Sequence, residues 1–177
     1  MRTEIARAVK AHFERRMKES LPRYALQQRT TYGQVYRASL AAKNCYVHLQ
    51  LTRKKDDERF IVELAASDGD FPWDYVLGSP FNVRDGNMRF RLPELFREEW
   101  QSRGTESSWW CVGPWTSARD RLKTLLSAGS RGLSKREVVP SEQLLPLVAP
   151  AVDDAFQKLV DLGIPFIEKF ASTGSLS

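Results

Sequence analysis

The chain holds few residues of the types that act as nucleophiles or bind transition metals, because it has two cysteines and two histidines. Cys45 and His48 lie three residues apart in CYVHLQLT (45–52), which reads as a strand. Their side chains therefore point to opposite faces and cannot pair as nucleophile and base. Pairing His48 with Cys111 would require the fold to join them and to stabilise a thiolate. We expect two buried, reduced cysteines and no structural zinc, since the Cys and His spacing matches no zinc motif.

Carboxylates gather after one predicted strand, where Asp68 and Asp70 are followed by Asp74. Such a group could bind Mg²⁺, or join Glu63 and a lysine in a nuclease-like site. The E-x-K spacing of that site is missing, because two apolar residues follow Glu63. The letters SDGD are also typical of a plain turn, since Asp and Gly accept turn backbone conformations. The sequence favours the turn over the metal site, and a small hydrolase or nuclease using His48 with Asp68 and Asp70 is the third hypothesis.

Tryptophan is concentrated in SSWWCVGPW (107–115), which holds three of the five tryptophans in the chain. On a strand, Trp109 and Trp110 must face opposite ways, so one packs in the core and its neighbour faces a second layer or solvent. We predict that Trp110 contributes to an interaction surface, because an exposed tryptophan marks a partner site more often than a catalytic one.

Two predicted strands place polar side chains on one face. In CYVHLQLT, the polar residues alternate with Cys45, Val47 and Leu49, and NMRFRL (87–92) alternates arginine with apolar residues. Antiparallel sheets commonly bury one face and leave the other wet, so this polar row faces solvent, a cleft or a second layer. The full set of predicted interaction residues is Trp110, Tyr46, His48, Gln50, Arg89 and Arg91.

Motifs for phosphate-binding loops and hydrolase elbows are missing from the sequence. It contains no G-x-x-x-x-G-K-[ST], no G-x-G-x-x-G and no G-x-S-x-G. We therefore assign no catalytic residue, no cofactor and no metal site.

The elements that must position these residues form one α+β domain over residues 1–170. We predict an antiparallel sheet of about four to six strands, packed on one face by N- and C-terminal helices. Gly163 is interpreted as a helix terminator, and Pro150 suits a first helical turn. The expected segments are a helix 3–20, strands 32–40, 45–52 and 59–67, an ordered loop 68–86, a strand 87–92, a short helix 94–101, a strand within 107–115, a helix 116–129, a flexible link 130–140, helical segments 141–148, 150–163 and 164–171, and a disordered tail 171–177.

Composition is that of an ordinary soluble domain, with 177 residues, 42% hydrophobic and 28% charged. No apolar run approaches the ~18 residues that cross a bilayer, and the N-terminus lacks a signal-type segment, so we expect a cytoplasmic protein with no membrane partner. The net charge is +5, and residues 1–66 carry 14 Lys and Arg against 7 Asp and Glu. This basic half could attract an anionic partner, although the cations stand singly among acids.

The order of these elements resembles a family of uncharacterised bacterial single-domain proteins, classed as domains of unknown function. The resemblance covers roughly residues 5–170 and rests on the hairpin YVHLQLTRKKDDERFIVELAAS (46–67) and the ending LVDLGIPFIEKFA (159–171). It implies an α+β fold and a bacterial cytoplasmic setting. It carries no catalytic residue, cofactor or substrate.

We interpret the chain as a non-enzymatic protein that binds another macromolecule. A protein partner comes first, as for an immunity or accessory factor. The alternative is a basic nucleic-acid-binding protein, in which cations meet phosphates and rings stack on bases.

Overall fold

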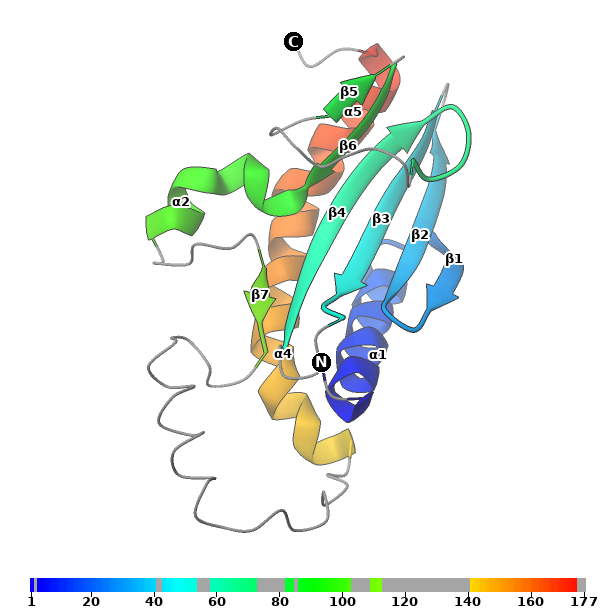
Figure 1. Ribbon diagram of the computed structural model, residues 1–177. Helices are drawn as coiled ribbons and strands as arrows, with labels where there is room; N and C mark the ends of the chain where they lie inside the picture. Colours follow the sequence, from blue (N-terminus) through cyan, green and yellow to red (C-terminus); the bar gives the residue numbers. More distant parts are fainter. Residues whose placement is uncertain are drawn as a thin grey trace.

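The computed structural model contains one antiparallel sheet with helices on one side (Figure 1). The predicted helix 116–129, the link 130–140 and Asp74 lie outside the residues that the structure describes. Those residues are 1, 3–40, 43–53, 58–72, 82–84, 86–102, 109–112 and 141–174.

Six strands form the main path of the sheet in the order β1-β2-β3-β4-β6-β5, and a short seventh strand, β7, pairs with the beginning of β4. All pairs are antiparallel, and β2, β3 and β4 follow one another as a meander. The strands are β1 (Ala25–Thr30), β2 (Gly33–Leu40), β3 (Lys43–Leu51), β4 (Arg59–Ser67), β5 (Asn82–Arg84), β6 (Asn87–Arg91) and β7 (Trp110–Cys111).

Alternation along these strands divides the sheet into two faces. Cys45, Val47 and Leu49 point to the main core together with Val62 and Leu64 of β4. The residues between them on β3 and β4 point to the opposite face, which holds the second apolar cluster around Tyr46 and Phe71.

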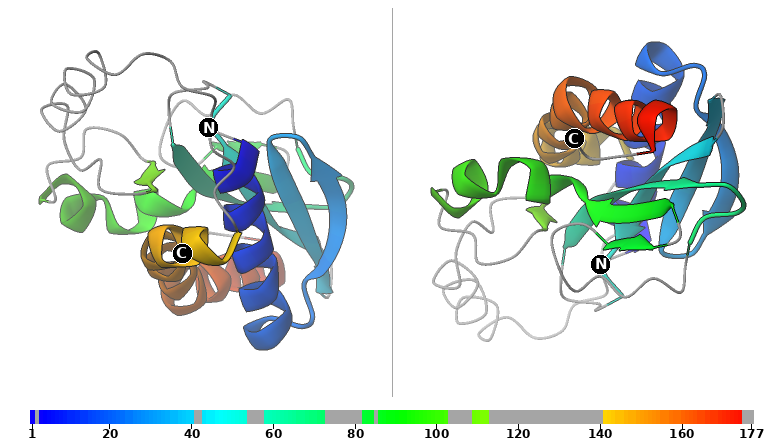
Figure 2. Two further views of the ribbon diagram at one scale, coloured as in Figure 1. Left: turned by 90° about the horizontal axis from the view of Figure 1, so that it is seen from below. Right: turned by 90° about the horizontal axis from the view of Figure 1, so that it is seen from above.

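Helices cover the core face of the sheet, as the views in Figure 2 show. The stripe Ile5, Val9, Phe13 and Met17 is buried along the first helix because apolar residues recur there every four positions. Phe13 and Phe156 pack edge to face with ring centroids 5.9 Å apart, which joins the N- and C-terminal helices. The helical elements are α1 (Thr3–Ser20), η1 (Leu92–Phe96), α2 (Arg97–Ser102), α4 (Ser141–Lys158), η2 (Leu159–Gly163) and α5 (Ile164–Thr173). Among the described residues, none of these helices is long and apolar enough to cross a bilayer.

Gly163 does not terminate a helix, which corrects the prediction. The chain continues without a break from α4 through the wider turn η2 into α5, and Gly163 keeps right-handed helical dihedrals (φ −67°, ψ −51°). A Cβ atom at this position would lie 2.8 Å from Leu64 Cδ1 and 2.9 Å from Leu92 Cδ1. The glycine therefore allows the helix to approach the sheet closely, and Pro150 lies inside α4 instead of beginning it.

The predicted α+β class, with helices on one face of an antiparallel sheet, is confirmed. Three further details of the structure differ from the sequence prediction. The sequence prediction missed β1, whose residues are mostly exposed and therefore show no apolar alternation. The predicted loop 68–86 contains β5, and α5 extends to Thr173, into the predicted tail 171–177.

Candidate functional site

The face of the sheet opposite the helices collects polar residues in two rows that run across the strands. Arg37 on β2 stands opposite Tyr46 on β3, and Ala65 on β4 links that pair to Arg89 on β6. The register places these residues side by side because each strand turns every second side chain to this face.

The second row is the centre of the site. It runs from Val35 through His48 and Glu63 to Arg91. Glu63 lies between the histidine and the arginines and is fully buried, with 0% of its surface exposed. We call Glu63, His48, Arg89 and Arg91 the Glu63 cluster.

Hydrogen bonds converge on one oxygen of Glu63. His48 Nδ1 lies 3.0 Å from Oε2, and an Arg89 guanidinium nitrogen donates to the same oxygen at 2.8 Å. The Nε atom of Arg91 is 3.9 Å from the other oxygen, Oε1, which is too far for a hydrogen bond. Among the described residues, Oε1 accepts no hydrogen bond. Oε2 of Glu63 thus has two hydrogen-bonding partners, whereas Oε1, on the side of Arg91, has none among the described residues.

Burial raises the pKa of the Glu63 carboxyl, while the hydrogen bonds from His48 and Arg89 and the positive charge of Arg89 lower it. The lowering prevails, so the pKa of Glu63 lies below its ordinary value. Glu63 is therefore ionised near neutral pH. Since a carboxylate can only accept, His48 Nδ1 must carry the proton of their shared hydrogen bond.

Phe71 covers the cluster from the segment that follows β4. Its ring meets the His48 ring edge to face at 5.3 Å and the Tyr46 ring at 5.7 Å, and the Arg89 guanidinium lies 5.1 Å from its centroid. Arg89 also donates to the carbonyl oxygen of Pro72 at 3.1 Å. Ring and backbone contacts therefore hold this segment over the buried charges.

A glycine closes the other side of His48. A Cβ atom at Gly33 would lie 3.0 Å from His48 Nε2 and 2.4 Å from the Leu49 carbonyl oxygen. A histidine oriented by a carboxylate can act as a general base. This ring, however, is packed between Phe71, Glu63 and the Gly33 backbone and is only 5% exposed. Such enclosure favours a structural role for His48.

Tyr46 and Arg37 fix the border of the cluster. The Tyr46 hydroxyl donates to the Gly69 carbonyl oxygen at 2.6 Å, and burial raises the pKa of Tyr46. Arg37 donates to Asn44 Oδ1 at 2.8 Å and stays half-buried. This side of the sheet therefore presents a guanidinium held by a neighbouring strand.

Four of the six predicted interaction residues are buried, so they do not form an exposed surface. They are Tyr46, His48, Arg89 and Trp110, with 0%, 5%, 7% and 4% of their surface exposed. Gln50 and Arg91 are half-exposed. The structure brings His48, Arg89 and Arg91 into one cluster, with Tyr46 beside it.

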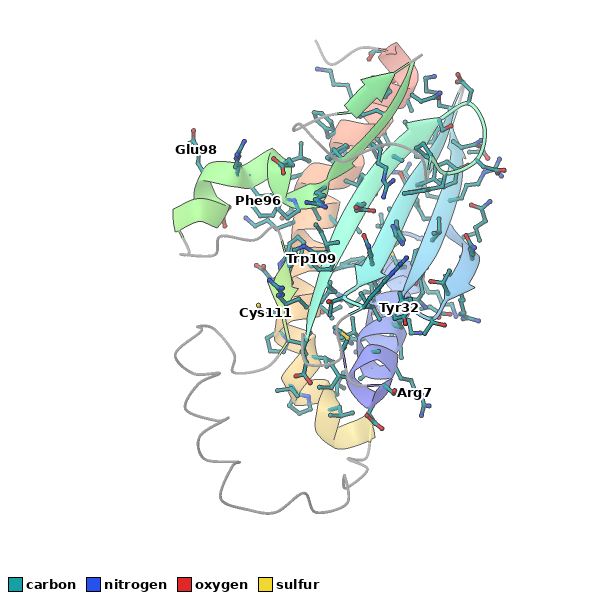
Figure 3. All side chains as sticks on the ribbon, viewed as in Figure 1. Arg7, Tyr32, Phe96, Glu98, Trp109 and Cys111 are labelled. Atoms are coloured by element: carbon teal, nitrogen blue, oxygen red, sulfur yellow. The ribbon has the colours of Figure 1, made fainter. Side chains whose placement is uncertain are left out.

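Trp110 belongs to the other face of the sheet, so the prediction of an exposed ring at this position is wrong. Its indole stacks on Phe60 with centroids 5.8 Å apart, and its Nε1 atom donates to Asp154 Oδ2 at 2.8 Å. It joins β7 to α4. Trp109 is half-buried against the same core, and Figure 3 shows it near Cys111 beside the C-terminal helix.

The predicted grouping of His48 with Asp68 and Asp70 is not the one that the structure favours. The histidine takes Glu63 as its carboxylate, while Asp68 is exposed and pairs with Lys43 at 2.7 Å. Asp68 follows Glu63 by five residues, roughly 16 Å along an extended chain. No group of three or more His, Cys, Asp or Glu in the described ranges could hold a metal ion.

The sequence interpretation considered Glu63 only as part of a nuclease-like site with a lysine and did not place it with the arginines. A signal was present, because Glu63 is the one acid within the apolar stretch FIVELAA (60–66). Its spacing of two residues from Ala65 puts it on the face opposite the core, but only the strand register reveals His48 and Arg91 as neighbours.

Both cysteines are free thiols, as the sequence predicts. Cys45 is buried in the core, and burial raises the pKa of its thiol to about 12. Cys111 is half-exposed, which differs from the prediction that both are buried.

In comparisons with known proteins, the chain matched no family model, no curated protein and no solved structure. The resemblance to the uncharacterised bacterial family therefore stays a prediction.

Proposed function

We propose that this protein binds an acidic surface of another protein, as an immunity or accessory factor does, through the sheet face that carries the Glu63 cluster. The observation that carries the proposal is the charge of that face. Among the described residues, Arg89 and Arg91 reach the Glu63 carboxylate from β6, and Arg37 lies in the neighbouring row opposite Tyr46. Arg37 and Arg91 stay partly exposed on this face, and accessible cations of this kind favour an acidic partner.

The partly exposed arginines Arg91 and Arg37 supply the groups that would contact the partner. The side chain of Arg91 is 34% exposed, and it stands above the Glu63 oxygen that accepts no hydrogen bond among the described residues. Arg37 is half-buried at the other end of the rows. Arginine is favoured at protein interfaces because its planar group binds carboxylates through two parallel hydrogen bonds.

Burial of the aromatic rings supports a protein partner over a single-stranded nucleic acid. Bases stack on exposed rings, whereas Tyr46 and Phe71 on this face are 0% and 5% exposed. Among the described residues of this face, Arg37 and Arg91 are the accessible cations.

The test is affinity capture from an extract of the cells that make the protein, with and without nuclease, followed by calorimetry with the purified captured protein. The variant is Arg37→Gln with Arg91→Gln, which removes two charges without adding a carboxylate beside Glu63. The matched control is Arg97→Gln with Lys169→Gln, two exposed cations on α2 and α5. Trp110→Ala is unsuitable, because this buried ring would report on stability.

We expect a protein captured at one-to-one stoichiometry with or without nuclease. Its affinity should fall by about tenfold or more in the Arg37/Arg91 variant and stay unchanged in the control. Capture that nuclease abolishes would replace the proposal with the nucleic-acid reading. Equal affinity of both variants would overturn the assignment of this face.

A further inference from the structure

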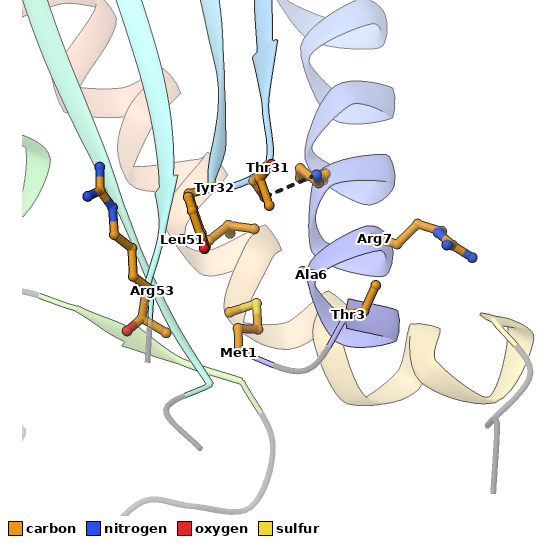
Figure 4. Close-up of a pocket in the computed structure, with 10 residues that line it drawn as sticks. Met1, Thr3, Ala6, Arg7, Thr31, Tyr32, Leu51 and Arg53 are labelled. Atoms are coloured by element: carbon orange, nitrogen blue, oxygen red, sulfur yellow. Dashed lines mark hydrogen bonds between the residues drawn. The ribbon is translucent and has the colours of Figure 1, made fainter. Parts of the chain in front are cut away.

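A separate hollow of about 380 Å³ lies between the first half of α1, the turn from β1 to β2 and the end of β3 (Figure 4). Its size falls within the range of small-molecule sites, which is about 300–1,000 Å³. The hollow shares no lining residue with the Glu63 cluster. A ligand here would therefore be independent of the partner proposed for the sheet face.

The charged residues that line the hollow, as far as the structure describes them, are all cationic: Arg7, Lys10 and Arg53. The Lys10 ammonium lies 3.5 Å from the carbonyl oxygens of Thr30 and Thr31, and Figure 4 marks the second contact with a dashed line. These contacts are at the long limit for hydrogen bonds and leave the ammonium donor capacity for an anion. Figure 4 shows the ends of Arg7 and Arg53 directed away from the hollow, so these two cations add only to the surrounding potential.

Part of the remaining lining is apolar. Leu51 is buried at the end of β3 and Ala6 faces it from α1. Tyr32 is 44% exposed, which is unusual for a large ring among the described residues, and its ring lies 5.5 Å from the Arg53 guanidinium carbon. A ligand that covers Tyr32 and Ala6 with a flat apolar body would bring an anionic head to the neighbourhood of Lys10.

We propose that this hollow binds a small organic anion with a flat apolar body and a carboxylate or phosphate head. Lys10 and the surrounding positive potential select the charge, while the Ala6 and Tyr32 surface contributes burial of the apolar body. The two head groups share one chemistry, and the probes below separate them.

The test is a titration of ¹⁵N-labelled protein with phenyl phosphate, benzoate and uncharged benzyl alcohol, followed by amide chemical shifts. We expect at least one anion to shift the amides of Ala6, Thr31 and Leu51 in a saturable way, with benzyl alcohol at least about tenfold weaker. Whichever anion binds more tightly identifies the head group.

The variant Lys10→Gln with Arg53→Gln should weaken the anion by about tenfold. The control Arg97→Gln with Lys169→Gln removes the same charge elsewhere and should bind like the parent protein. A preserved amide spectrum shows that the variants are folded. Absence of saturable shifts at the hollow, equal binding of benzyl alcohol, or equal loss in both variants would each overturn the proposal.

Discussion

The Nδ1 atom of His48 lies 3.0 Å from Oε2 of Glu63, and the two residues stand directly opposite each other in the β3–β4 ladder. This cross-strand pair places an ionised carboxylate at 0% exposure in the middle of the sheet. A buried charge is expensive unless it is paired and hydrogen-bonded. Arg89, on the neighbouring strand, donates to the same oxygen and so ties β6 to the pair.

Glu63→Gln should destabilise the protein by about 3–5 kcal/mol, because it leaves the buried Arg89 charge without its carboxylate. Glu98→Gln is the control, since Glu98 is an exposed acid on α2 and should change stability by less than about 0.5 kcal/mol. Urea unfolding followed by circular dichroism measures both. A loss below about 1 kcal/mol in Glu63→Gln would show that the cluster does not stabilise the fold.

The lowered pKa of Glu63 also makes stability depend on pH. A carboxyl whose pKa is lower in the folded state than in the unfolded chain stabilises the fold fully above the unfolded value, which is about 4.3 for Glu. That stabilisation is lost as the pH falls through the folded pKa, where the buried carboxylate takes up a proton. Urea midpoints measured from pH 6 to pH 3 should fall more steeply for the parent protein than for Glu63→Gln. Parallel curves would contradict the assignment.

Gly163→Ala tests the close packing of the C-terminal helix on the sheet. The new methyl group would meet Leu64 and Leu92 within 3 Å, and such overpacking costs about 1–3 kcal/mol. Gly69→Ala is the matched control, because a Cβ atom there meets no heavy atom within 4 Å and the backbone conformation accepts alanine. Thermal unfolding compares the two. An unchanged midpoint in Gly163→Ala would show that the helix can move away from the sheet without loss.

The sequence was sufficient to predict a helix or strand where a single hydrophobic pattern determines that element. Alternation in CYVHLQLT predicted β3, and the apolar stretch RFIVELAAS predicted β4 as the returning strand. Apolar residues at three- and four-residue steps predicted α1, because burial of one face dominates in that helix. Gly163 was misread because a glycine that ends a helix and a glycine that admits a neighbouring leucine look alike in sequence. The site was misread for a related reason: His48 and Arg91 look like wet polar positions until the register shows Glu63 between them and Phe71 above.

The two cysteines should differ in reactivity. Burial raises the pKa of the Cys45 thiol to about 12, so almost no thiolate is present at pH 8 and reagents have no access. Cys111 is half-exposed. Ellman's reagent at pH 8 should therefore modify one thiol in the folded parent protein, none in Cys111→Ser, and both in urea. Rapid reaction of folded Cys111→Ser would show that the core around Cys45 opens.

The two histidines should carry their protons on different ring nitrogens. An Arg15 guanidinium nitrogen lies 2.9 Å from His12 Nδ1 and can only donate, so Nδ1 must accept. His12 therefore carries its proton on Nε2, which lies 3.0 Å from Asp153 Oδ1 and joins α1 to α4. His48 has the reverse arrangement, because its Nδ1 donates to Glu63 whether or not Nε2 is also protonated. Two-bond ¹H–¹⁵N correlation spectra at pH 8, assigned with His12→Gln, should show a protonated Nε2 in His12 and a protonated Nδ1 in His48. An unprotonated Nδ1 in His48 would remove the hydrogen bond on which the Glu63 cluster depends, whereas a protonated Nδ1 in His12 would remove only the contact with Arg15.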